Sequence, residues 1–213
     1  MHQHLLKKLL RVRERKRKPK RKPKKLQPVL GKSLQVINKE FDHIVIGAGI
    51  VGISIGLAIL ERNPDKKVLV IDKESKPGIH ASGRNSGVLH AGFYYSPDSL
   101  KAKFCRLGNM ELKNFCKENE IPILETGKVV VCQTKSDVTR LEELYRRGIA
   151  NGVDIEILDS SNLDKIEPAA KTIDKFIWSP TTAVGNPQLV ITKLAEKFLK
   201  NGEILQYFST SLT

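Results

Sequence analysis

Cysteine is scarce in this sequence, and its spacing excludes two classes of site. The chain of 213 residues has three cysteines, Cys105, Cys116 and Cys132, and no Cys-x-x-Cys pair. An odd and widely spaced set builds neither a disulfide framework nor a zinc site of the usual spacing. We therefore expect reduced, mostly buried thiols of the kind found in cytoplasmic proteins, and no bound metal.

Long apolar runs are also missing. No run reaches the roughly 18 residues that indicate a membrane-spanning helix. The N-terminal stretch lacks the apolar segment and the small-residue cleavage site of a secretory signal. Apolar residues still make up 40% of the chain, enough for a hydrophobic core. These features predict a cytoplasmic protein, and its basic N-terminus leaves open a peripheral position at the inner face of the membrane.

Acidic residues are nearly absent from the first 25 residues, where basic residues are concentrated. This stretch holds 13 Lys or Arg and one acid, Glu14, so it supplies +12 of the formal charge of +14 and leaves +2 for the rest. A segment of this kind cannot bury a core. We expect residues 1–40 to be a basic disordered tail and linker, or in part a misassigned start. Its functional alternatives are organelle targeting and weak contact with an anionic membrane or nucleic acid.

The first strong feature is a glycine-rich turn between an apolar strand and a helix. Residues 41–46 form an apolar run, and Gly47, Gly49 and Gly52 follow in the pattern Gly-x-Gly-x-x-Gly. In this pattern the first glycine permits a tight turn, the second lets a pyrophosphate approach the backbone, and the third lets the helix pack close to the strand. The N–H groups at the helix start would face the phosphates.

The residues after the turn complete a βαβ unit that is typical of dinucleotide binding. A helical stretch over 53–63 ends before Pro64, a second apolar strand covers 68–71, and Asp72 comes twenty residues after Gly52. An acid at that place is the expected partner of an adenosine ribose hydroxyl. The alternative, a glycine-rich hairpin with a surface aspartate, does not account for the order of these elements.

A second glycine-rich stretch covers residues 78–95. It has too much glycine for a stable helix and is too long for a simple turn. We expect it to form a loop that lies against a flat ligand. Its polar and aromatic side chains include His80, Arg84, His90, Tyr94 and Tyr95.

The rest of the chain alternates helix and strand patterns. Three helices are predicted from their first residues, Ser99, Ser136 and Pro187. The apolar face of the first should point to a core and consists of Leu100, Phe104, Leu107, Leu112 and Phe115. A short helix is predicted from residue 160, and the third long helix is expected to end at residues 201–202. Strands are predicted over residues 128–132, 155–158, 175–178 and 203–208.

The two glycine-rich stretches resemble the FAD-dependent oxidoreductases of the D-amino-acid oxidase superfamily, and most closely its L-2-hydroxyglutarate oxidase/dehydrogenase family. The more specific part is Ser-Gly-Arg-Asn-Ser-Gly-Val-Leu-His-Ala-Gly-Phe-Tyr-Tyr at 82–95, with Ser-Leu-Lys-Ala-Lys at 99–103. Segments 127–131 and 166–168 are also similar to family segments. The resemblance covers residues 41–208. It implies an α/β fold, with a Rossmann-like FAD-binding parallel sheet and an inserted, incomplete α+β substrate lobe.

The resemblance also implies domain boundaries. The first part of the FAD-binding domain would occupy residues 41–98, a partial substrate lobe 99–186, and a truncated return to the FAD-binding domain 187–213. The family is roughly twice as long, so we expect an N-terminal fragment whose cofactor cleft is open on one side and which turns over little by itself. The family usually has an acid near the segment that here covers residues 181–187, and this chain has Asn186 in it, so no role is assigned there.

FAD is the cofactor that the resemblance implies. The glycine turn would hold its pyrophosphate, Asp72 its adenosine ribose, and the second glycine-rich loop its flavin. The residues expected to bind the cofactor are Gly47, Ala48, Gly49, Ile50, Val51, Gly52, Asp72, Lys73, Ser82, Asn85, Ser86, Gly87 and Val88.

The implied reaction is oxidation of an L-2-hydroxy acid, expected to be L-2-hydroxyglutarate giving 2-oxoglutarate, with oxygen or a membrane quinone as the electron acceptor. His90 would lie near the flavin and take the proton of the substrate hydroxyl, a task that suits a group with an unperturbed pKa near 6.5. Tyr94 and Arg84 would orient a carboxylate. The residues alone equally allow His90 and both tyrosines to be packing residues and Arg84 to be a surface cation.

Two other functions stay open at this point. One is an FAD oxidase of the same superfamily that acts on an amino acid or a sarcosine-like amine. The other is a non-catalytic, truncated product that binds a nucleotide, or a binding module with a basic tail.

Overall fold

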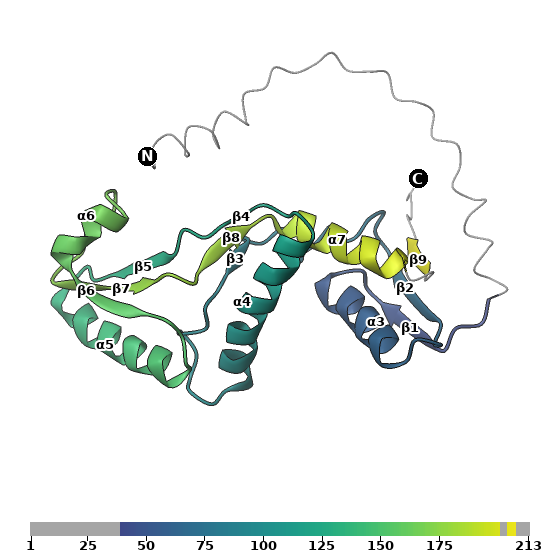
Figure 1. Cartoon of the computed structure of the whole chain (residues 1–213), viewed down its shortest axis with the longest axis horizontal. Coiled ribbons are helices and arrows are strands. Elements are labelled where there is room, and N and C mark those ends of the chain that lie inside the picture. The colour runs from purple at the N-terminus through teal and green to yellow at the C-terminus, as the bar shows by residue number, and fades with distance from the viewer. Residues whose placement is uncertain (1–38, 201–203, 208–213) are drawn as a thin grey trace, which may run out of the picture. The chain divides into compact units, whose positions relative to one another are not determined.

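The computed structural model describes residues 39–200 and 204–207 (Figure 1). The predicted tail and linker therefore lie outside the described residues, except for residues 39–40. The predicted end of the last helix at residues 201–202 lies outside them as well.

Helices and strands alternate along the described part of the chain. Its helices are α3 (Ile50–Arg62), α4 (Leu100–Glu118), α5 (Lys135–Ala150), α6 (Leu163–Ile166) and α7 (Pro187–Lys200), with one 3₁₀ turn, η2 (Ser160–Asn162). Its strands are β1 (His43–Ile46), β2 (Val68–Asp72), β3 (Val88–Leu89), β4 (Ile123–Leu124), β5 (Lys128–Val131), β6 (Glu156–Asp159), β7 (Lys175–Ser179), β8 (Ala183–Gly185) and β9 (Ile204–Tyr207).

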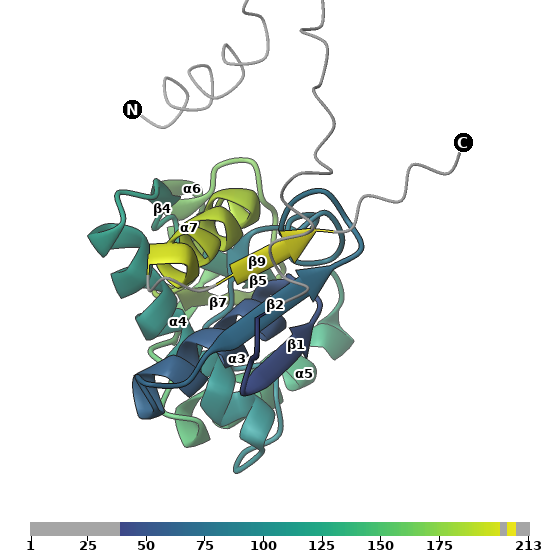
Figure 2. The same cartoon turned by 90° about the vertical axis from the view of Figure 1, so that its right-hand side faces the viewer.

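A parallel sheet of β1, β2 and β9 carries the glycine turn, with β2 in the middle (Figure 2). Val45 of β1 lies opposite Val70 of β2, which in turn lies opposite Leu205 of β9. Parallel neighbours need a crossover, and α3 supplies the one between β1 and β2. The expected parallel sheet and α/β fold class are confirmed.

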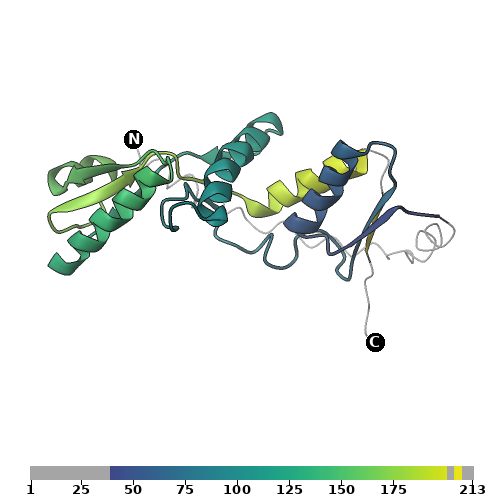
Figure 3. The ribbon, with the colours of Figure 1, turned by 90° about the horizontal axis from the view of Figure 1, so that it is seen from below.

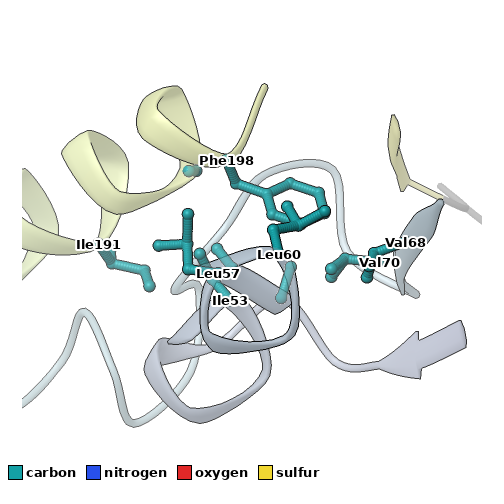
Figure 4. Close-up of a cluster of buried hydrophobic side chains, with 9 residues drawn as sticks. Ile53, Leu57, Leu60, Val68, Val70, Ile191 and Phe198 are labelled. Carbon is teal, nitrogen blue, oxygen red and sulfur yellow. The ribbon is translucent and has the colours of Figure 1, made fainter. Parts of the chain in front are cut away.

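The core of this sheet lies beneath α3 and α7, which run side by side (Figure 3). Phe198 of α7, Ile53 of α3 and Val70 of β2 are fully buried, and Figure 4 shows the phenylalanine ring directed toward α3. A Cβ at Gly56 would lie 2.8 Å from that ring, so the glycine permits this close approach. Burying such a side chain contributes about 1.5–3 kcal/mol. The cluster therefore joins helices that are far apart in sequence.

An antiparallel sheet of β5, β7 and β6 forms a second core with α5. Leu141 of α5 and Ile177 of β7 are buried in it. Ala91 and Phe93, from the second glycine-rich loop, are buried in the same cluster. This burial anchors the loop on either side of Ala91–Phe93, and so fixes the positions from which His90 and Tyr94 emerge.

A third sheet, of β3, β8 and β4, connects the loop to α4. The buried Asn109 of α4 donates from Nδ2 to the carbonyl oxygens of Leu89 (2.8 Å) and Thr181 (3.2 Å). This side chain therefore satisfies one backbone acceptor in β3 and another in the turn before β8. None of these short strands was predicted.

The predicted helix starts are confirmed at Ser99 and wrong at Ser136. The N–H of Ala102 donates to Ser99 Oγ at 3.1 Å, which is the expected cap. The next helix instead follows Thr134, whose N–H donates to Asp137 Oδ2 at 2.8 Å in a capping box. Asp137, three residues on, supplies the reciprocal bond that decides the start.

The predicted core face of α4 is also wrong at its N-terminal end. Leu100 and Phe104 are 69% and 63% exposed. The buried positions are Ala102, Asn109 and Cys116, at seven-residue spacing. That spacing keeps them on one side of a helix, opposite to Leu100 and Phe104. The close-packed side contains the small Ala102 and the polar Asn109, so hydrophobicity alone predicts the opposite side of the helix as the buried one.

Candidate functional site

The glycine turn after β1 has a backbone that other residues could not reproduce. Gly47 has a φ of 108°, and its N–H donates to the carbonyl oxygen of Ile71 at 2.7 Å. A Cβ at Gly52 would lie 1.9 Å from the carbonyl oxygen of Gly47. The first glycine therefore makes the turn and the third lets α3 start against it, as the sequence pattern predicts.

Asp72, at the end of β2, is hydrogen-bonded to the turn. Its Oδ2 accepts the N–H of Ala48 at 2.5 Å, and its Oδ1 accepts the N–H of Glu74 at 2.8 Å. A carboxylate has about four acceptor positions, so these two bonds leave others for a ribose hydroxyl. Burial, together with the Asp72 charge, raises the pKa of Tyr207 on the adjacent strand to about 12. The next residue, Lys73, is exposed.

Ser82 lies at the N-terminus of α3. Its Oγ accepts the N–H of Ile50 at 2.9 Å, and a Cβ at Gly49 would come within 3.0 Å of the same oxygen. The first turn of this helix contains no acidic residue that would repel an anion. A hydroxyl that accepts one bond can still donate its own hydrogen to a phosphate oxygen. Val51, the next predicted contact, is exposed on this helix start.

Asn85 holds the second glycine-rich loop in shape. Its Nδ2 donates to the carbonyl oxygens of Ala81 (3.0 Å) and Ser82 (3.1 Å), and its Oδ1 accepts the N–H of Gly87 at 2.9 Å. Gly87 has a φ of 70°, and its carbonyl oxygen accepts the N–H of Gly185 at 2.9 Å. The asparagine therefore acts on the loop backbone.

An apolar cavity of about 140 Å³ lies between the helix start and this loop. Five residues predicted to bind the cofactor line it: Ile50, Ser82, Asn85, Gly87 and Val88. The other lining residues, which the sequence did not suggest, are Leu89, Leu112, Gly185, Pro187 and Val190. Gly185 and Pro187 flank Asn186, to which the sequence assigns no role. Ser86, also predicted, is exposed and does not line the cavity.

His90 and Tyr94 come together with a lysine that sequence reasoning missed. Tyr94 stacks on Phe93 with ring centroids 4.3 Å apart, and Lys128 Nζ lies 4.5 Å from the Tyr94 ring centroid. His90 is exposed at the surface, and its partial desolvation, followed by the charge of Lys128, lowers its pKa below the ordinary value of 6.5. His90 is thereby held in the neutral form that can accept a proton.

Arg84, the third predicted catalytic residue, is exposed, and its side chain makes no hydrogen bond or ion pair with the described residues. The structure does not bring it into the group formed by His90, Tyr94 and Lys128. Within the described part of the chain, no group of three or more His, Cys, Asp or Glu side chains is placed to hold a metal ion. None of the described helices is long and apolar enough to cross a membrane.

The donor set fits a dinucleotide that ends in a flat aromatic ring. A glycine turn and a helix N-terminus suit a pyrophosphate, Asp72 suits a ribose, and the apolar cavity suits the edge of a ring system. The fold and site therefore define a dinucleotide-binding α/β protein.

The family model described as FAD-dependent oxidoreductase (DAO) matches residues 42–211. The chain belongs to this family of FAD-dependent oxidoreductases, and FAD is the family's cofactor.

Similar curated proteins carry one name. The chain is 44% identical over 160 residues to an L-2-hydroxyglutarate dehydrogenase of Indibacter alkaliphilus, covering 75% of this chain and 40% of the relative. It is 40% identical over 164 residues to the mitochondrial L-2-hydroxyglutarate dehydrogenase of Caenorhabditis briggsae, covering 76% and 38%. The protein of that name from Salmonella houtenae is 37% identical over 172 residues, covering 80% and 40%. The chain thus spans about two fifths of the length of these relatives.

Solved structures support the fold. L-alpha-glycerophosphate oxidase from Mycoplasma pneumoniae, with FAD bound, matches with a TM-score of 0.72 at 24% identity, over 80% of this chain and 45% of that one. Glycine oxidase from Geobacillus kaustophilus matches with a TM-score of 0.69 at 19% identity, over 79% and 46%. Both chains are larger, and the described sheets and helices reproduce part of each.

Proposed function

We propose that this chain forms the FAD-binding part of an L-2-hydroxy-acid dehydrogenase, and that the substrate is L-2-hydroxyglutarate, giving 2-oxoglutarate. The observation that carries the proposal is the apolar cavity beside the glycine turn, with His90, whose pKa is lowered, directly after one of its lining residues, Leu89. The shared name of the curated relatives supports the choice of substrate. Because the chain spans about two fifths of those relatives, the proposal concerns the reaction to which it contributes.

The glycine turn and α3 would hold the pyrophosphate of FAD. The Ser82 hydroxyl would donate to a phosphate while it accepts the N–H of Ile50. Asp72 would accept a ribose hydroxyl with the positions that Ala48 and Glu74 leave free. Lys73 and Ser86, both exposed, would contact the outer parts of the cofactor.

The flavin would lie against the apolar cavity, with Val88 and Gly87 along it. This arrangement assigns residues 41–98 and 187–213 to the FAD-binding domain and residues 99–186 to a substrate lobe. The buried Asn109 of the substrate lobe would hold the two parts together through its bond to the carbonyl oxygen of Leu89.

FAD, when bound, supplies the two-electron acceptor for the hydride that leaves C2 of the substrate. His90 would take the hydroxyl proton at a ring nitrogen, because its lowered pKa keeps it unprotonated at neutral pH. Tyr94, 36% exposed beside it, would present its ring and hydroxyl to the substrate carboxylate. Arg84 would act at the edge of the site, from an exposed position.

The electron acceptor is oxygen or a membrane quinone in this proposal. The protein would work in the cytoplasm. In an alternative form of this proposal, its basic tail holds it at the inner face of the membrane. The charge of the tail is what supports this alternative, since the first 25 residues supply +12 of the formal net charge of +14.

FAD uptake followed by anaerobic reduction tests the proposal. Purified full chain is titrated with FAD, and L-2-hydroxyglutarate is then added without oxygen. The expected results are the visible spectrum of a bound flavin and its bleaching when the substrate is added. A matched variant, Asp72→Asn, should bind FAD more weakly, whereas Asp65→Asn, an exposed acid in the preceding turn, should not.

Three results would contradict the proposal. A colourless chain that takes up no FAD would identify the chain as a non-catalytic, truncated protein. Retention of FAD without any bleaching would contradict the placing of the proton acceptor and the substrate-binding residues on this chain. Bleaching by glycine or sarcosine, but not by L-2-hydroxyglutarate, would identify an amine-oxidising member of the family.

A further inference from the structure

Lys128 is a partly buried cation without an acidic partner. It is the first residue of β5, and none of the ion pairs formed among the described residues includes it. Glu125, the nearest acid in sequence, pairs instead with Lys113 at 2.7 Å. The charge of this half-buried lysine is therefore not balanced by a carboxylate in the described part of the chain, and a bound anion would balance it.

The lysine is directed to the residues that the proposed reaction uses. Its Nζ lies 4.5 Å from the centre of the Tyr94 ring, a cation–π distance that fixes the end of a long, flexible side chain. Its charge acts on His90, and no carboxylate acts on that histidine in the opposite sense. The potential around the two side chains is therefore positive, and favours an anionic ligand.

A second lysine in the chain makes the same ring contact without this setting. Lys101 Nζ lies 4.5 Å from the ring centre of Tyr95. Lys101 is exposed on the first turn of α4, and its charge does not contribute to the pKa of His90. The two pairs share one geometry, so the ring contact by itself is not what distinguishes Lys128.

We propose that Lys128 binds the C1 carboxylate of the 2-hydroxy acid and so directs the neighbouring C2 hydroxyl to His90. The proposal rests on the proposed function for the identity of the acid. Only the C1 carboxylate is adjacent to the carbon that reacts, so a cation beside the proton acceptor selects that group. Lys128 thus takes the carboxylate-binding role expected of Arg84, which the structure leaves exposed and apart.

The same placement explains why a lysine can coexist with a base. A cation beside His90 disfavours the protonated imidazole, and so keeps the ring nitrogen free to accept the hydroxyl proton. When a carboxylate binds to Lys128, it offsets this charge. Substrate binding therefore makes His90 more basic at the moment when it is used.

The experiment uses NMR of the full chain with labelled histidine. The His90 ring signals are followed in two titrations, one against pH and one with L-2-hydroxyglutarate, in wild type and in Lys128→Met, Lys128→Arg, Lys101→Met and Arg84→Met. Lys128→Met should raise the pKa of His90. It should also weaken the binding of L-2-hydroxyglutarate at least about tenfold, which is the loss expected when a charge-assisted contact is removed. Lys128→Arg should keep binding within about threefold, because a guanidinium also pairs with carboxylates. Lys101→Met should change neither quantity.

The outcomes separate this proposal from the one on which it rests. Weakening by Arg84→Met, with Lys128→Met unchanged, would overturn the assignment of the carboxylate to Lys128. An unchanged His90 pKa in Lys128→Met would overturn the electrostatic effect of Lys128 on His90. If sarcosine binds in place of L-2-hydroxyglutarate and still depends on Lys128, the proposed substrate fails, whereas the carboxylate-binding role of Lys128 stands.

Discussion

The cofactor side and the substrate side of the site are built in different ways. On the cofactor side, polar side chains bond to backbone groups: Asp72 to Ala48, Ser82 to Ile50, and Asn85 to Gly87. On the substrate side, the His90 ring makes no hydrogen bond with the described residues. Tyr94 and its lysine meet through a ring contact alone.

Because of this difference, a substitution should have a different effect on each side. The cofactor side is part of the turn and the helix start, so a change there acts on folding and on FAD binding together. The substrate side consists of His90 and Tyr94, which emerge from an anchored loop, and of Lys128 at the start of β5. A change there should act on turnover and leave the fold intact. Four variants and conditions test this division.

The largest effect is expected in the core under the parallel sheet. Phe198→Ala removes a fully buried ring between α3 and α7 and should lower the free energy of unfolding by about 3–5 kcal/mol. Denaturant unfolding measures it. Leu199→Ala, at the next position and 47% exposed, is the control and should stay within about 0.5 kcal/mol. A loss below about 1 kcal/mol for Phe198→Ala would show that the fold does not depend on this ring.

The next effect is expected at the glycine turn. Gly52→Ala places a Cβ 1.9 Å from the carbonyl oxygen of Gly47, so the turn must move. We expect a loss of about 1–3 kcal/mol in unfolding free energy, as for other overpacked positions, together with weaker FAD binding in a fluorescence titration. Gly108→Ala, where a Cβ meets no atom within 4 Å, should reduce neither. Normal FAD affinity in Gly52→Ala would break the link between turn geometry and cofactor binding.

The cofactor side could largely be predicted from the sequence, because its signals are local. Gly47 and Gly52 are needed for the turn itself, and Asp72 ends the strand that follows the crossover helix. The Ser99 cap and the starting Pro187 likewise act within one helical turn. Each of these features is determined by residues close to it in the chain, so it can be predicted from a single sequence.

The rest of the site depends on contacts between distant segments. Gly87 meets Gly185 across a pairing of two short strands, and neither strand is long enough to show alternation. Lys128 reads in the sequence as a polar residue at a strand start, and only the fold brings it over Tyr94. Asn109 looks like an exposed helix position until its two carbonyl acceptors are known. Such residues have no periodic pattern from which to predict them.

A substrate-side change should leave stability unchanged and remove activity. His90→Gln is expected to change the free energy of unfolding by no more than about 0.5 kcal/mol. The rate of flavin bleaching by L-2-hydroxyglutarate should fall by about 10²–10⁴-fold, the usual contribution of a positioned base. His80→Gln is the control for bleaching, because the His80 ring pairs with Glu74 at 2.7 Å and is not part of this group. A large loss of stability in His90→Gln would place this histidine on the structural side of the comparison.

The smallest effect is the pH dependence of stability that comes from His90. Its folded pKa is below the ordinary 6.5, first through partial desolvation and then through Lys128. The unfolded chain therefore binds more protons as pH falls below 6.5, so this contribution is present above that value and is lost as pH falls through the folded pKa. The difference in unfolding free energy between wild type and His90→Gln, measured from pH 7.5 to pH 5, should shift against the wild type. Adding Lys128→Met to both proteins should reduce that shift, and an opposite sign would mean that a carboxylate, rather than the lysine, controls the base.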